Sequence, residues 1–227
     1  MKKLAIAINI ILCALVILFD ELYISYSELW MKATASILFT LIGAVNLCFA
    51  CKAKTEHKKF CIVLLVGLVF AMLGDIVLNL HFISGAALFG VGHIFFFVSF
   101  CFLVKFTLKD LLYGAIIFVP SLLFIVLAPF FDFGGVLMEI VCIIYALIIS
   151  CMVGKALSNL ISAKSILTIV IFIGTVLFFF SDLMLLLNVF GGLPKFVDIL
   201  CLATYYPAEI ILGFSILLSS NILNKAG

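Results

Sequence analysis

Long apolar segments separated by short polar gaps are the feature that most constrains this chain. A helix needs about 17–25 mainly apolar residues to cross the hydrocarbon core of a bilayer. Reading from one lysine-rich or turn-rich gap to the next gives eight such segments, over residues 4–19, 33–51, 60–80, 86–104, 111–128, 136–153, 165–188 and 199–220. The sequence therefore predicts an all-α, polytopic membrane bundle of eight transmembrane helices.

The composition excludes a soluble domain. Hydrophobic residues make up 67% of the chain and charged residues only 11%, whereas soluble domains are about 45–50% apolar. A formal net charge of +2 is too small to predict a nucleic-acid partner. Because no gap is long enough to be a linker, residues 1–227 are predicted to form one transmembrane domain whose surroundings are the lipid bilayer.

The lysines predict how the helices are oriented. All 13 basic residues are lysine; if the amino terminus is cytoplasmic, 11 of them fall on the inner side, including Lys155 in the gap at 154–164. Only Lys32 and Lys195 fall outside, which is a strong positive-inside bias and predicts that both termini are cytoplasmic. No A-x-A-like cleavage site follows the first segment, so it is expected to be a retained helix. A bacterial protein of this kind would lie in the inner membrane.

Four ionisable residues stand inside the apolar segments: Asp75, His93, Asp182 and Glu209. Counting 1.5 Å per residue from the predicted helix ends places them within a layer of about 10 Å. An unpaired charge near the bilayer centre costs about 2.5–3.5 kcal/mol or more on insertion scales. We therefore expect these groups to face one another or a hydrated cavity.

Polar and small residues beside the four acids and bases complete the candidate site: Asn79, Ser181, Tyr205 and Tyr206. Asn79 follows Asp75 by four residues and Tyr205 precedes Glu209 by four, so each pair shares a helix face. Lys32 is expected to be solvated or to snorkel at an outer helix end. The eight cysteines are expected to be helix-packing residues, and neither a metal nor a cofactor is predicted.

Two carboxyl groups in an apolar site suit two kinds of chemistry. Burial favours the neutral form of a carboxyl group, and a second carboxylate nearby makes the two groups ionise separately. One group can then act as a general acid while the other acts as a base, as in glycoside hydrolysis. The same pair can relay protons in a transporter, or can simply hydrogen-bond across helices. The residues alone leave these alternatives open.

Four motifs resemble the YhhN family of eight-helix membrane proteins, which includes the animal lysoplasmalogenases: GDIVL at 74–78, GHIFFF at 92–97, SDLMLLL at 181–187 and YYPAEIIL at 205–212. The resemblance covers essentially the whole chain. It implies hydrolysis of the vinyl ether bond of lysoplasmalogens, giving a fatty aldehyde and a glycerophospho-ethanolamine or -choline. It also implies that Asp75 and Asp182 are catalytic and that His93 supports them. Glu209 stands where the family motif Y-x-x-A-Q has glutamine, and Lys32-Ala33 stands where the family has Lys-Pro.

In this interpretation the substrate is a lysophospholipid. One aspartate protonates a vinyl ether carbon, and the other stabilises the resulting cation and activates water; which aspartate does which is left open. The alternative is a proton-coupled transporter that uses the same acids. It is favoured by the recurrence of GDIVL and SDLML 107 residues apart, which hints at a parallel repeat of four helices. A third alternative is a lipid-binding or scaffold protein without either activity.

Overall fold

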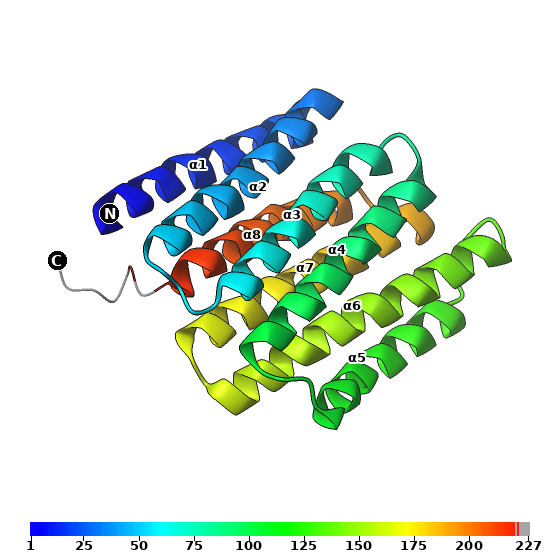
Figure 1. Cartoon of the computed structure of the whole chain (residues 1–227). Helices are drawn as coiled ribbons and strands as arrows, with labels where there is room; N and C mark the ends of the chain where they lie inside the picture. The colour runs from blue at the N-terminus through cyan, green and yellow to red at the C-terminus, as the bar shows by residue number, and fades with distance from the viewer. Residues whose placement is uncertain (221, 223–227) are drawn as a thin grey trace.

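The protein, described here from a computed structural model over residues 1–220 and 222, is a bundle of eight helices with no strand in that range (Figure 1). The helices are α1 (Lys2–Tyr26), α2 (Leu29–Lys52), α3 (Lys58–Leu78), α4 (Phe82–Leu103), α5 (Leu108–Leu127), α6 (Val136–Ala163), α7 (Ile166–Phe190) and α8 (Phe196–Leu218). All eight are long and apolar enough to cross a membrane. The predicted fold class and number of spans are therefore confirmed.

Both described ends of the chain lie at one end of the bundle, which we call the terminal end (Figure 1). The opposite, distal end carries the α1–α2, α3–α4, α5–α6 and α7–α8 connections. Most lysines lie near the terminal end, as the alternation of the helices requires; Lys225 lies outside the described residues. The cytoplasmic location of this end stays a prediction.

Lys155 corrects one part of the lysine argument. The gap predicted at 154–164 is helical, because α6 continues to Ala163, and Lys155 is fully buried within it. Its Nζ donates a hydrogen bond of 2.8 Å to Asp110 Oδ2 on α5. Asp110 also accepts from the Thr107 backbone N–H and so closes the capping box that begins α5. The prediction of a gap here was wrong, because Asp110 neutralises Lys155 inside the bundle and α6 continues past it; Lys155 still lies toward the terminal end.

The two halves of the chain pack in the same order. α3 packs extensively on α4, and α7 packs in the same way on α8. Between the halves, α2 of the first packs against α8 of the second. The corresponding pair, α6 of the second half and α4 of the first, packs in the same way. The helices α1–α4 and α5–α8 are thus related as two similar units, with Asp75 on α3 and Asp182 on α7 at corresponding places.

Glycines let α3 and α4 approach closely beside Asp75. A Cβ at Gly92 would lie 3.2 Å from the carbonyl oxygen of Gly67, and one at Gly74 would lie 2.9 Å from the ring of Phe89. Small residues at such contacts are the usual means of close helix packing in membranes. The ring of Phe89 therefore packs directly beside the helix turn that carries Asp75.

The terminal and distal ends of the bundle differ in how tightly side chains fill the space between the helices. Toward the terminal end, bulky side chains are fully buried between the helices, among them Phe60, Leu64, Phe100 and Met152. Toward the distal end, the helices leave two adjoining cavities. The candidate site lies in this distal half.

Candidate functional site

Asp75 is the centre of a buried cluster between α2, α3 and α8. Its Oδ1 lies 3.2 Å from Lys32 Nζ, and its Oδ2 accepts a hydrogen bond from Ser36 Oγ on the same helix as Lys32. The Tyr206 hydroxyl lies 3.4 Å from Asp75 Oδ2 and 3.4 Å from the backbone oxygen of Lys32. The side chains of the ion pair are only 8% and 3% exposed, so Asp75 carries its own countercharge inside the bundle.

The ion pair overturns the prediction for Lys32. This lysine is buried rather than solvated, and its Nζ lies 5.5 Å from the centre of the Tyr23 ring on α1. A buried lysine requires an opposite charge nearby, and Asp75 provides it. Asp20 is a second acid of this region that sequence reasoning assigned to a gap; it is buried in α1 and acts electrostatically on both Lys32 and Asp75.

Asp182 is the centre of a second cluster, between α4, α6 and α7. The Tyr145 hydroxyl donates a 2.8 Å hydrogen bond to Asp182 Oδ2, and His93 Nε2 lies 3.3 Å from the same oxygen and 2.8 Å from the Tyr145 hydroxyl. Since Tyr145 gives its proton to Asp182, His93 Nε2 must carry the hydrogen that faces both oxygens. No hydrogen bond from the described residues reaches Asp182 Oδ1, and the side chain is 13% exposed.

Aromatic rings hold His93 in place. The ring of Phe178, which is fully buried, meets the His93 ring edge-on with the centroids 4.7 Å apart. Phe178 also contacts Tyr205 and Phe89 in the same manner. Of the three phenylalanines before Asp182, only Phe179 lines a cavity, while Phe180 is 38% exposed on the outer surface.

The first cavity, here called the polar cavity, holds about 220 Å³ and contains both aspartates in its lining. Its polar lining residues include Tyr23, Lys32, Asp75, Asn79, Asp182 and Asn188. Asn79 Nδ2 donates to the Asp75 backbone oxygen at 2.9 Å, and Asn188 Nδ2 donates to Asp198 Oδ1 at 3.2 Å. The predicted supporting residues Ser181 and Tyr205 also line it.

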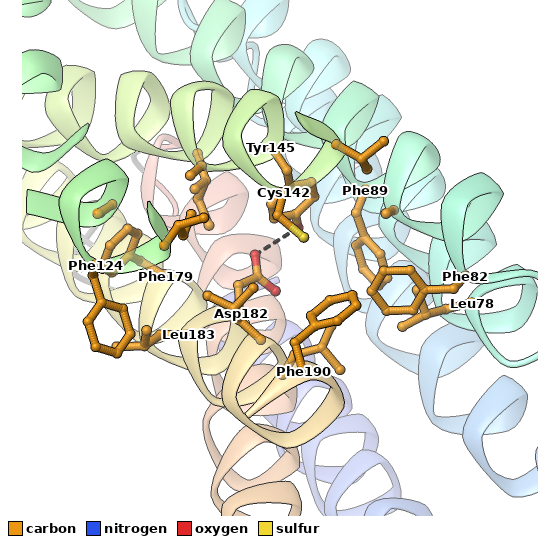
Figure 2. Close-up of a pocket in the computed structure, with 18 of the residues that line it drawn as sticks. Leu78, Phe82, Phe89, Phe124, Cys142, Tyr145, Phe179, Asp182, Leu183 and Phe190 are labelled. Atoms are coloured by element: carbon orange, nitrogen blue, oxygen red, sulfur yellow. Dashed lines mark hydrogen bonds between the residues drawn. The ribbon is translucent and has the colours of Figure 1, made fainter. Parts of the chain in front are cut away.

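The second cavity, here called the apolar cavity, holds about 320 Å³ and lies between α4, α5, α6 and α7. Figure 2 looks into it: Asp182 lies at its centre with a hydrogen bond to Tyr145, Phe124 and Leu183 lie on one side, and Phe82 and Phe190 lie on the other. The two cavities share a wall made of Leu78, Phe82, Phe89, Asp182 and Leu185. Asp182 is the only ionisable residue in that wall.

Glu209 is placed apart from the other predicted residues. It is fully buried in α8, lines neither cavity, and neither of its carboxyl oxygens has a hydrogen-bond partner. The Tyr205 hydroxyl, also without a hydrogen bond, lies close enough to act on it electrostatically, as do Asp75 and Asp182. The structure therefore places two of the four predicted ionisable groups, Asp75 and Asp182, in the cavity walls. His93 contacts Asp182 without lining either cavity, and Glu209 does neither.

A family model matches the part of the chain that carries the motifs of these two clusters. The model of the YhhN family matches residues 27–216, which run from the start of α2 nearly to the end of α8. The chain belongs to the YhhN family. No curated protein and no solved structure matches it significantly.

The YhhN match includes every hydrogen-bond and ion-pair partner of the Asp75 and Asp182 side chains described above, and it leaves out all of α1. Tyr145 is the partner of Asp182 that sequence reasoning missed. Its only signal was a tyrosine near the middle of the apolar segment 136–153, and no spacing relates it to Asp182. Within the described residues, no three His, Cys, Asp or Glu side chains come close enough together to hold a metal ion.

Proposed function

We propose that this YhhN-family protein hydrolyses the vinyl ether bond of lysoplasmalogens within the membrane. The observation that carries the proposal is that Asp75 and Asp182, from different helices and with different partners, line one cavity. Acid cleaves a vinyl ether by protonating an alkenyl carbon, after which water attacks the neighbouring carbon. The reaction therefore needs an acid and a base that both reach the substrate. Two buried carboxyl groups in unlike surroundings provide them.

Asp75 is the base in this mechanism. Asp75 acts in this mechanism as a carboxylate, and Lys32 Nζ at 3.2 Å supplies the opposite charge inside the bundle. An ionised carboxylate stabilises a cation that forms beside it and can take a proton from water. Tyr206 and Ser36 fix the orientation of Asp75 by donating to its Oδ2.

Asp182 is the acid. Tyr145 and His93 both reach its Oδ2, so Oδ1 is left to carry a proton toward the substrate. Asp182 gives this proton to the alkenyl carbon that is not bonded to oxygen, and the neighbouring carbon becomes an oxocarbenium ion.

Water then attacks the oxocarbenium carbon and gives its proton to Asp75. The hemiacetal breaks its bond to the glycerol oxygen, which takes the proton back from Asp75, while the hemiacetal hydroxyl returns a proton to Asp182. The products are a fatty aldehyde and a glycerophosphodiester. Both aspartates end in their starting protonation states, so no further reactant is consumed besides one water.

Aldehyde release by the purified protein in liposomes tests the proposal. Asp75→Asn and Asp182→Asn are each expected to lower turnover by about 10²–10⁴-fold, the usual contribution of a general acid or base. Glu56→Gln, an exposed acid in the α2–α3 connection, is the matched control and is expected to keep wild-type turnover. Full activity of either aspartate variant would refute this mechanism.

A proton-coupled transporter is the second candidate, and the similar packing of the two halves favours it. Transport also requires a path through the terminal half, which is filled by buried side chains such as Phe100 and Met152. Uptake of a lysophospholipid into proteoliposomes without release of aldehyde would support transport over hydrolysis. A pH gradient that drives no uptake would count against transport.

A further inference from the structure

The apolar cavity is larger than the polar cavity, and the hydrolysis mechanism uses only the single aspartate in its wall. Nearly all of its lining is aliphatic or aromatic; the polar side chains are Ser121, Tyr145 and Asp182. Tyr145 and Asp182 bond to each other at one place in that lining. A molecule that fills this cavity must therefore be a hydrocarbon over most of its length.

Aromatic rings close the cavity toward the distal end. Phe124 on α5 contacts Phe131, Phe131 contacts Phe133, and Phe133 contacts Phe190 on α7, with ring centroids 5.0–5.4 Å apart. Phe190 in turn meets Phe82 on α4 at 5.4 Å. The backbone N–H of Asp132 donates to the Phe190 carbonyl oxygen at 2.9 Å and ties the α5–α6 connection across the end of α7.

The side between α5 and α7 is not closed by a helix contact. Among the described helices α5 packs only against α6. It is held there toward the terminal end, where Gly114 and Gly154 let the two backbones touch and Asp110 pairs with Lys155. Toward the distal end, α5 and α7 both line the cavity, although their backbones make no close approach to each other.

We propose that the apolar cavity binds the single hydrocarbon chain of a lysolipid, which enters from the bilayer between α5 and α7. This inference rests on the proposed function for the reactive bond and deepens it by naming how the substrate lies. The chain follows the apolar cavity, its head group lies in the polar cavity, and the bond between them passes Asp182 in the shared wall. Lipid chains are as apolar as the lining, so entry from the bilayer exposes no hydrocarbon to water.

The linings of the two cavities also predict a preference for lipids with one chain over lipids with two. A lipid with a second chain would have to place it in the polar cavity, whose lining includes Lys32, Asp75 and Asn188. Covering such groups with hydrocarbon leaves them without water or a partner. We therefore expect binding of lysolipids and rejection of diacyl lipids with the same head group.

A photoreactive lysolipid tests the site without relying on hydrolysis. The probe is a saturated 1-O-alkyl glycerophosphoethanolamine that carries a diazirine in its chain, and its ether has no double bond to protonate. Labelling of the full-length protein in liposomes is expected within residues 120–125 and 179–190, and a diacyl probe is expected to label these segments at least tenfold less. Label spread evenly over lipid-facing residues of all helices would overturn the inference.

Ser121→Trp and Leu123→Trp are the matched variants. Ser121 lines the cavity, whereas Leu123, two residues further along α5, is 51% exposed and lies outside the lining. S121W is expected to reduce labelling at least tenfold and L123W to leave it unchanged; equal labelling of both variants refutes the site. If S121W does not fold, the wild-type map of labelled peptides decides.

Turnover of the vinyl ether substrate, measured on the same preparation, separates this inference from the proposed function. Localised labelling by a protein that releases no aldehyde supports the chain site and refutes the hydrolase. Aldehyde release with no localised labelling refutes the chain site and leaves the hydrolase standing.

Discussion

Asp75 and Asp182 lie at corresponding places in the two halves of the molecule, yet their partners differ in charge. Asp75 on α3 is contacted from α2 and α8, by Lys32 and Tyr206. Asp182 on α7 is contacted from the corresponding helices α6 and α4, by Tyr145 and His93. The two acids thus occupy corresponding positions but have different partners.

The difference teaches how two identical side chains can do different work. A fixed cation balances Asp75, which is 2% exposed, while Asp182 has hydrogen-bond donors on one oxygen and cavity on the other. One acid is paired with a fixed cation, and the other has an oxygen left free to exchange a proton in the proposed reaction. The predictions below test this division, beginning with the largest expected effect.

Removing the cation should damage the first cluster most. Lys32→Met leaves Asp75 buried without its countercharge, and breaking a buried ion pair in this way costs about 3–5 kcal/mol. The free energy of unfolding in mixed micelles, measured by titration with denaturing detergent, should fall by that amount. Combining Lys32→Met with Asp75→Leu should recover most of the loss, because no unpaired charge then remains. A K32M protein as stable as wild type would mean that the ion pair does not hold Asp75 ionised.

The second cluster should respond mainly in catalysis. Tyr145→Phe removes one donor to Asp182 Oδ2, and a hydrogen bond to a charged or ionisable group contributes about 1.5–3 kcal/mol. We expect kcat for aldehyde release to fall by about 10–100-fold, with stability lowered less than in K32M. Because Tyr145 also lines the apolar cavity, KM should be measured separately; a change in KM alone would make Tyr145 a binding residue only.

The smallest effect concerns how the outermost helix of each half is held. In the first half, Asn9 on α1 and Asn46 on α2 exchange hydrogen bonds of 2.8 and 2.9 Å, and Asn46 also donates to the Gly213 carbonyl oxygen on α8. In the second half, an ion pair and two glycines hold α5. Hydrogen bonds between membrane helices average about 0.6 kcal/mol.

Asn46→Ala should therefore lower the free energy of unfolding by about 0.6–1.7 kcal/mol in the same detergent titration. Turnover should stay within about twofold of wild type, because Asn46 touches neither cavity. Loss of turnover in Asn46→Ala would instead show that α1, with Tyr23 and Asp20, must be held tightly for the polar cavity to form.

The fold was predictable because membrane helices are defined by length and apolar composition. The eight segments and their order follow from the sequence, and the errors lie at helix ends, where residues such as Asp20 and Lys155 are polar but buried. A charge at a predicted helix end normally indicates water. It misleads when the neutralising partner comes from another helix, as Asp110 does for Lys155.

The site was predictable in its acids and not in their partners. An aspartate inside an apolar segment is rare enough to draw attention by itself, so Asp75, Asp182 and Glu209 were all apparent in the sequence. Lys32 and Tyr145 were not, because lysine and tyrosine are ordinary near the ends or in the middle of membrane helices. Glu209 shares a face of α8 with Tyr205, which lines the polar cavity, but it lies one turn further toward the terminal end and lines neither cavity. The depth argument was too coarse to resolve that one turn.

In the proposed hydrolysis, the position of Asp182 in the wall between the two cavities also gives each product a separate way out. A bond cut at that wall leaves a long-chain aldehyde on one side and a charged, water-soluble phosphodiester on the other. The aldehyde can leave sideways and partition into lipid, while the phosphodiester can diffuse away through the polar cavity. The proposed reaction would then release an apolar product into lipid and a charged product into water from one site.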